Sequence, residues 1–60
     1  MAPGFEIAMV TDDVASAHQT ALKAGAKELQ PPSKKPWGQV VSYVQDMNGF
    51  IVEICSLMNS

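Results

Sequence analysis

Residues 46–55 decide the fold, and they read Asp46-Met47-Asn48-Gly49-Phe50-Ile51-Val52-Glu53-Ile54-Cys55. The Asn-Gly pair supplies the positive backbone angles that a tight hairpin turn needs. The apolar run after it predicts a β-strand over residues 50–55. Before the turn, residues 39–45 alternate around three valines and a tyrosine, which predicts the other strand of the hairpin. We therefore expect an antiparallel pair of strands in this part of the chain.

A glutamate interrupts the apolar pattern in two predicted strands. Glu53 lies inside the last strand, and Glu6 lies near the start of a first strand that spans residues 5–10. Because successive side chains of a strand point to opposite faces, each carboxylate lies opposite the bulky apolar side chains of its strand. Burying a carboxylate in such a strand costs free energy unless the carboxylate is solvated, paired with another group or bound to a cation. The pattern predicts a sheet with one apolar face and one face that carries functional side chains, which we call the working face.

Pairing across the hairpin determines which residues share a face. A four-residue turn pairs Gln45 with Phe50 and places Ser42 opposite Glu53. The working face then carries Glu6, Ala8, Val10, Ser42, Glu53 and Cys55. A slip of one residue would reverse the two faces of the strand over residues 39–45. We expect a helix to cover the apolar face.

Residues 11–25 predict that helix. Residues 11–13 are Thr-Asp-Asp, which supply N-cap chemistry and negative charge where the helix dipole favours it. Apolar residues recur at three-and-four spacing from Val14 to Leu22, and Gly25 is a natural C-terminal stop. His18 falls on the apolar stripe, which predicts a position in the core or at its edge.

A short edge strand and an irregular loop are expected after the helix. Residues 27–30 are polar and few, and two prolines follow them, which suits an edge strand. The segment from Pro31 to Trp37 contains three prolines and predicts an ordered surface loop. Two roles are open for Trp37. Its side chain could cover the mouth of a cavity as a lid, or it could pack against the end of its own domain as a plug.

Length and composition limit what one copy of the chain can do. Its sixty residues predict a single domain over 1–60, and such a domain buries only about 60% of the surface its unfolded chain exposes. We therefore expect a stabilising partner, most simply a second copy. Cys55 is the only cysteine, which excludes an internal disulfide and fits a reducing compartment. With no signal-peptide or membrane-spanning run in the sequence, we expect a cytoplasmic protein.

The charge pattern argues against binding to nucleic acid. Four lysines and no arginine stand against six acidic residues, and the formal net charge is −2. No basic stripe is present that would attract a phosphate backbone.

The order of these segments resembles the vicinal oxygen chelate superfamily, which includes glyoxalase I, bleomycin-resistance proteins and extradiol dioxygenases. The segments that carry the resemblance are Thr11-Asp12-Asp13-Val14, Ala24-Gly25-Ala26, Pro36-Trp37-Gly38-Gln39, Asp46-Met47-Asn48-Gly49 and Val52-Glu53-Ile54. It implies an α+β fold: one βαβββ module, with a mixed four-stranded sheet and one helix on one face. The module is similar to the C-terminal half of the family's usual two-module chain. A second copy would complete the family's cup-shaped cavity, which implies a homodimer or a higher homo-oligomer.

The resemblance also implies site residues. Metallo-enzymes of this family take their ligands from the first and last strands of each module, and Glu6 and Glu53 occupy those positions. In a dimer the two chains would contribute two copies of each carboxylate. Oxygen-only ligation suits magnesium, manganese or calcium better than zinc or nickel. Contacts with a small-molecule ligand are expected from Ser42, Trp37, Cys55 and Ala8.

Three functions remain open at this point. The first is a small-molecule binding protein of the bleomycin-resistance type, which holds a flat or cationic compound in a cleft at a homodimer interface. The second is a lyase, isomerase or dioxygenase whose divalent metal chelates vicinal oxygens of the substrate. The third is a truncated module without catalytic activity. The absence of an imidazole among the expected ligands favours the binding protein, and whether the chain is an enzyme stays open.

Overall fold

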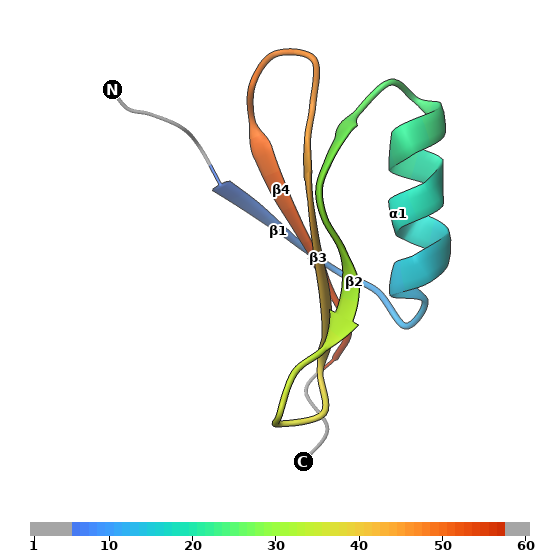
Figure 1. Ribbon diagram of the computed structural model, residues 1–60, viewed down its shortest axis with the longest axis vertical. Coiled ribbons are helices and arrows are strands. Elements are labelled where there is room, and N and C mark those ends of the chain that lie inside the picture. Colours follow the sequence, from blue (N-terminus) through green and yellow to red (C-terminus); the bar gives the residue numbers. More distant parts are fainter. Residues whose placement is uncertain (1–5, 58–60) are drawn as a thin grey trace.

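The computed structural model describes residues 6–57, and of Glu6 it describes the backbone alone. One helix and four strands follow one another in the order βαβββ, and the strands form one mixed sheet (Figure 1). The elements are β1 (Glu6–Val10), α1 (Val14–Lys23), β2 (Lys27–Lys34), β3 (Val40–Gln45) and β4 (Ile51–Cys55). The strand order is β1-β4-β3-β2, with β1 parallel to β4 and the other neighbours antiparallel. The predicted α+β module is confirmed.

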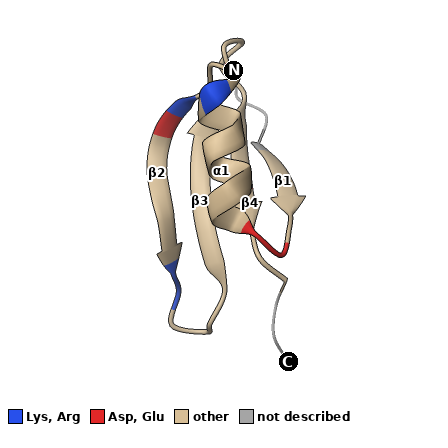
Figure 2. Cartoon of the chain, turned by 90° about the vertical axis from the view of Figure 1, so that its right-hand side faces the viewer, with Lys and Arg blue, Asp and Glu red and all other residues tan. Residues whose placement is uncertain are grey.

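Helix α1 begins and ends where the sequence predicts. The Asp13 side chain accepts a hydrogen bond from the backbone N–H of Ser16 at 3.0 Å, which caps the first turn. After the helix, Gly25 has φ +105°, a left-handed conformation that glycine adopts without steric cost. The helix packs on β2, β3 and β4 and leaves β1 uncovered (Figure 2). One face of the sheet therefore carries the helix, and β1 extends beyond it.

The core lies between α1 and the sheet. Val14 of the helix, Val44 of β3 and Ile54 of β4 are buried against one another. The partly buried residues packed around them are Ala17, Ala21, Leu22, Ala26, Val40 and Val52. Because the helix contributes mainly small side chains, most of the buried apolar volume comes from the strands. The sheet therefore holds the helix in place rather than the reverse.

Strand β2 is longer than the sequence suggested. The predicted edge position is confirmed, but the strand continues through Pro31 and Pro32 to Lys34, so a loop starting at Pro31 was wrong. Its pairing with β3 shifts register between Glu28 and Gln30 and again between Gln30 and Ser33. Prolines fit such irregular positions on an edge strand because no ladder hydrogen bond needs their missing N–H.

The register of the β3–β4 hairpin differs by one residue from the expectation. Gln45 pairs with Ile51 and Tyr43 pairs with Glu53, so the predicted pairs of Gln45 with Phe50 and of Ser42 with Glu53 were wrong. The reason lies in Asp46, which extends the hairpin by one position. Its backbone N–H donates to the carbonyl of Phe50 at 2.9 Å, and its side chain accepts the backbone N–H groups of two turn residues. The slip moves every side chain of β3 to the opposite face.

Helix α1 is the only helix of residues 6–57, and it is too short to cross a membrane. This part of the chain therefore holds no helical membrane span.

Candidate functional site

The face of the sheet opposite α1, which we call the open face, carries the candidate site. The alternation of β1, β3 and β4 places eight residues on it. They are Ala8, Val10, Val41, Tyr43, Gln45, Ile51, Glu53 and Cys55. The helix lies wholly on the other side of the sheet (Figure 1). Within residues 6–57 no helix covers this face.

Glu53 and Tyr43 form a polar pair near the middle of the open face. They lie directly opposite one another on β4 and β3, and the Tyr43 hydroxyl donates a hydrogen bond to the Glu53 carboxylate at 3.3 Å. Both residues are half-buried, and their neighbours across the sheet include Ala8, which is opposite Glu53 on β1. A carboxylate has more acceptor sites than one hydroxyl fills. The pair can therefore accept a further hydrogen bond or attract a cation.

The structure places the other expected site residues as follows. Ala8 is exposed on the open face, as the sequence indicates. Cys55 lies on the same face, but it is only 7% exposed and its thiol contacts the carbonyl oxygen of Met9 at 3.6 Å. Little of its surface remains for contact with a ligand. Glu6 lies in β1, and its side chain is outside the described part of the chain.

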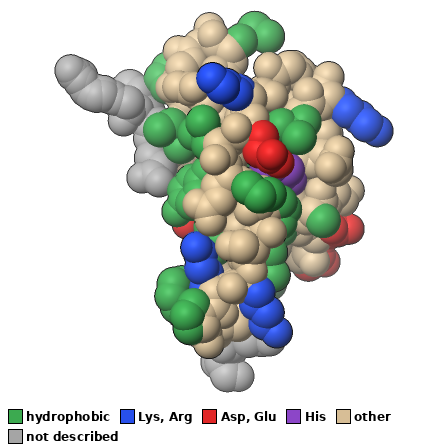
Figure 3. All heavy atoms as spheres, viewed as in Figure 1, with side chains coloured by type: hydrophobic (Ala, Val, Ile, Leu, Met, Phe, Trp, Pro, Cys, Tyr) green, Lys and Arg blue, Asp and Glu red, His purple; other side chains and the backbone are tan. Residues whose placement is uncertain are grey.

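Ser42 lies on the helix side of the sheet, so its expected place on the working face was wrong. It is fully buried, and its hydroxyl is hydrogen-bonded to Nδ1 of His18 at 2.9 Å. The other ring nitrogen of His18 lies 2.7 Å from a carboxylate oxygen of Glu28 on β2. The core position predicted for His18 is confirmed, since the residue is 1% exposed. In Figure 3 an acidic side chain (red) lies over part of the histidine (purple). These contacts satisfy two buried polar side chains and tie α1 to β2 and β3.

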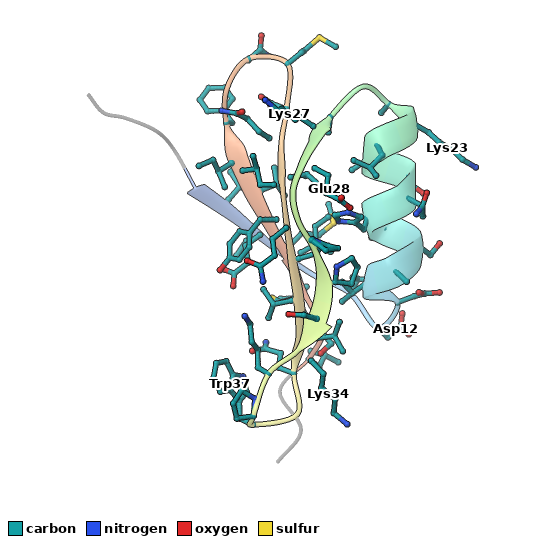
Figure 4. All side chains as sticks on the ribbon, viewed as in Figure 1. Asp12, Lys23, Lys27, Glu28, Lys34 and Trp37 are labelled. Carbon is teal, nitrogen blue, oxygen red and sulfur yellow. The ribbon has the colours of Figure 1, made fainter. Side chains whose placement is uncertain are left out.

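Trp37 lies at the turn between β2 and β3, on the side of the sheet away from α1 (Figure 4). Its side chain is 57% exposed, and its indole N–H donates to the side-chain oxygen of Gln39 at 2.8 Å. The amide nitrogen of Gln39 in turn donates to the backbone carbonyl of Ser56 at 2.8 Å. This exposure excludes a plug packed into the domain. The position of the turn places the ring at one end of the open face.

An apolar groove of about 430 Å³ lies on the other side of the sheet, between α1 and the sheet. Ala17, Ala21 and Thr20 form part of its helical wall, and Met9 and Val52 contribute from the sheet. Among the described residues that line it, Asp46 is the only charged one. The groove offers little polar chemistry, so the Glu53–Tyr43 pair makes the open face the better candidate for a functional site.

Three residues whose contacts are described above could not be recognised from the sequence. They are Tyr43, Glu28 and Gln39. Tyr43 was assigned to the helix side because the predicted register was one residue out. Glu28 contacts His18 of α1, and Gln39 contacts Trp37 in the preceding turn and Ser56 after β4. Neither residue stands out in a local sequence pattern. The signal that would have found Tyr43 is the Asp46 side chain, since its place in the turn fixes the register of β3 against β4.

Comparison with known proteins identifies the family. Residues 5–54 match the family model described as Glyoxalase/Bleomycin resistance protein/Dioxygenase superfamily. This match covers most of the chain, and the βαβββ topology agrees with it, so the chain belongs to this superfamily. A search of curated proteins gives no match.

Several solved structures are similar in fold. A glyoxalase-related enzyme from Fulvimarina pelagi is 28% identical with a TM-score of 0.81, over 90% of this chain and 41% of that one. TioX from Micromonospora sp. ML1 is 28% identical with a TM-score of 0.79, over 88% and 43%. A superfamily member from Sphaerobacter thermophilus DSM 20745 is 27% identical with a TM-score of 0.77, over 95% and 47%. The chain thus spans less than half the length of each of these structures.

The described residues of one chain do not by themselves fit a metal centre. Among residues 7–57, whose side chains the structure describes, no group of three or more histidine, cysteine, aspartate or glutamate side chains could hold an ion. On the open face Glu53 offers oxygen ligands, whereas the Cys55 thiol is buried against a carbonyl group. The imidazole of His18 lies on the other side of the sheet, between Ser42 and Glu28. Any metal site at this face would need ligands from elsewhere.

Proposed function

We propose that the chain binds a small molecule on its open face, in a cleft that two copies of the module form together. The observation that carries this proposal is the Glu53–Tyr43 pair, a hydrogen-bonded acid and phenol on a sheet face that no described helix covers. Ligand sites in proteins are largely apolar with a few well-placed polar groups. Ala8, Val10 and Ile51 supply apolar surface beside this pair. A planar or cationic compound suits such a face.

The outer edge of β1 supports the participation of a second copy. β1 is the end strand of the sheet, yet Ile7 and Met9 on one face and Val10 on the other are all exposed. Apolar residues on both faces are typical of a strand that is covered on both faces of its sheet, as a second copy packed here would do. Edge strands normally carry charge, proline or a bulge that prevents pairing. Of these, β1 has only the charge of Glu6 at its start, and its register with β4 is regular. β2, at the opposite edge, has two prolines and two register shifts.

Backbone direction at β1 also suits pairing between copies. The N–H of Thr11 donates to the carbonyl of Cys55 at 2.9 Å, so residue 11 faces β4. In a parallel pair the N–H and C=O of one residue point to the same neighbour, and successive residues alternate. Ala8 and Val10 therefore direct their backbone groups toward the outer edge. A second copy could add its own β1 there and bring two open faces together about a two-fold axis.

A metal-dependent lyase, isomerase or dioxygenase is the alternative function. Glu53 favours it, since this carboxylate occupies the last-strand position that supplies ligands in metallo-members of the superfamily. Two copies would bring two such carboxylates to one cleft, together with those of Glu6. A module without catalytic activity is the remaining possibility. Titration with manganese chloride separates the metal-dependent function from the proposed one.

We expect Glu53→Gln to weaken binding of a cationic planar dye, proflavine, about tenfold, which corresponds to a loss of about 1.4 kcal/mol. The reason is the loss of a charge-assisted contact on the open face. Tyr43→Phe should have a smaller effect, since the carboxylate stays. Asp12→Asn makes the same change of charge at an exposed position before α1 and serves as the matched control. Calorimetric titration at fixed ionic strength measures all four dissociation constants.

The same titration with two further probes distinguishes the functions. Anthraquinone-2-sulfonate, a planar anion, should bind more weakly than proflavine. Absence of measurable binding for both dyes at millimolar concentration would contradict the proposal. Tight manganese binding that Glu53→Gln abolishes would instead support the metal-dependent alternative.

A further inference from the structure

We propose that the apolar groove between α1 and the sheet is a second binding site, which takes a long-chain alkylammonium: a linear aliphatic chain with a cationic head. The groove lies on the side of the sheet that carries the helix, whereas the Glu53–Tyr43 pair lies on the open face. The inference therefore does not depend on the proposed function. Two observations carry it, namely the apolar lining of the groove and the carboxylate of Asp46 at one of its ends.

Small side chains of α1 leave room for the groove. Ala17, Ala21 and Ala24 follow one another at intervals of three and four residues, so they lie along one side of the helix. The helix packs on β2, β3 and β4 and not on β1, and Met9 of β1 also lines the groove (Figure 2). The resulting volume of about 430 Å³ lies within the usual range of small-molecule sites, about 300–1,000 Å³.

Aliphatic side chains of the sheet form the floor of the groove. Val44 and Ile54 are buried there, and Val52 is partly buried beside them. Met9 lies opposite Ile54 on β1 and is 47% exposed. None of the described residues that line the groove is aromatic. An aromatic ligand would therefore find no stacking partner here, whereas an aliphatic chain makes dispersion contacts along its whole length.

Asp46 gives the groove one negatively charged end. Its Oδ1 atom accepts the backbone N–H groups of Asn48 and Phe50, both at 2.9 Å. A carboxylate has more acceptor sites than these two donors fill, so it can also accept from the head group of a ligand. No lysine is among the described residues that line the groove. The charge of Asp46 therefore favours a cationic head over an anionic one.

The positions of Asp46 and Met9 along β4 indicate the length of the aliphatic chain. The N–H of Asp46 donates to the carbonyl of Phe50, and Met9 lies opposite Ile54. At about 3.3 Å per residue, the steps from Phe50 to Ile54 span about 13 Å. With carbon–carbon bonds of about 1.5 Å, an extended chain of about ten carbons has a similar length. The flexible thioethers of Met9 and Met47 can adjust to such a chain.

Decylammonium chloride is the probe, used below the concentration at which it forms micelles. We expect calorimetric titration to show that it binds to the wild-type protein. Octylammonium, which is two methylene groups shorter, should bind about tenfold more weakly. Decanoate, whose head is anionic, should also bind about tenfold more weakly or worse. Equal affinity for decylammonium and decanoate, or no binding of either, would overturn the proposal.

Asp46→Asn tests the contact with the head group. Asparagine keeps an oxygen that can accept the two backbone N–H groups of the turn, so the hairpin should stay intact. Affinity for decylammonium should fall about tenfold, whereas affinity for the uncharged 1-decanol should stay within about twofold. Asp12→Asn makes the same change of charge outside the groove and is the matched control. If instead Glu53→Gln weakens decylammonium binding and Asp46→Asn does not, the probe binds on the open face and the proposal is wrong.

Thr20→Phe tests the groove itself. Thr20 is exposed and lines the groove, so a phenylalanine there takes up its space without displacing the buried core. Affinities for decylammonium and for 1-decanol should both fall about tenfold or more. Gln19→Phe adds the same ring at the neighbouring exposed position, which does not line the groove, and should bind like the wild type. Circular dichroism verifies that both variants fold.

NMR spectroscopy of methionine methyl groups locates the bound probe. Met9 and Met47 both line the groove, so their methyl signals should shift when decylammonium is added and should show contacts with the alkyl chain. If decylammonium binds and neither signal changes, it binds elsewhere and the proposal is overturned. The proposal is also overturned if sedimentation velocity shows that decylammonium separates a dimer into monomers, since the groove would then be a surface between two copies.

Discussion

Replacing Ile54 with alanine should lower the free energy of unfolding by about 2–5 kcal/mol. Ile54 is 1% exposed and packs with Val14 and Val44 at the centre of the core. The loss has two parts: the transfer of the removed carbon atoms and the cavity they leave. A domain of this size has a total stability of roughly 3–9 kcal/mol, at the usual stability per residue. The substitution should therefore remove a large share of the total stability of the domain.

Chemical denaturation, followed by circular dichroism at one protein concentration, measures the effect. Met47→Ala is the matched control, since Met47 is 80% exposed and its truncation should change stability by less than about 0.5 kcal/mol. A change below about 0.5 kcal/mol for Ile54→Ala as well would mean that the face of β4 packed on α1 is assigned wrongly.

Placing proline at position 8 should abolish dimerisation and leave the fold of each copy intact. The backbone N–H of Ala8 points away from β4, so its loss breaks no hydrogen bond within the sheet. A second β1 paired at this edge would lose that donor in both copies. We expect the dissociation constant of the dimer to rise by at least about a hundredfold, since each lost pairing costs roughly 1 kcal/mol and the proline ring adds a clash.

Sedimentation velocity over a concentration series measures this change, and circular dichroism verifies the fold. Ala8→Ser retains the N–H and should dimerise like the wild type. Met9→Pro has the opposite geometry, because the N–H of Met9 points toward β4, and should destabilise the fold itself. A wild-type chain that sediments as a folded monomer at micromolar concentration would contradict the pairing of two β1 edges.

The elements of this fold could be predicted from the sequence because local chemistry specifies them. The acidic residues before Val14 and the glycine at position 25 mark the two ends of the helix, and both ends are where the sequence predicts. The alternation within β4 places Ile54 on one face and Glu53 on the other, whatever strand lies beside it. The placement of Cys55 on the open face follows from the same alternation.

The register of β3 could not be predicted in the same way, because it depends on how one side chain closes a turn. Asp46 accepts two backbone N–H groups within the turn and joins the hairpin, so the loop is one residue shorter than the spacing suggests. This exchanges Tyr43 and Ser42 between the faces. The contact of Ser42 with His18 could not be predicted for the same reason, and the course of β2 was obscured because its two prolines are typical of loops.

The central claim is that the ligand lies between the open faces of two copies. The stoichiometry of proflavine binding tests it most directly, measured by calorimetry with the protein well above the dissociation constants of both the dye and the dimer. The account predicts one dye molecule per pair of chains for the wild type, and no measurable binding for the folded monomer that Ala8→Pro produces. One dye molecule per chain, with unchanged affinity in Ala8→Pro, would contradict it, since a single module would then hold the complete site.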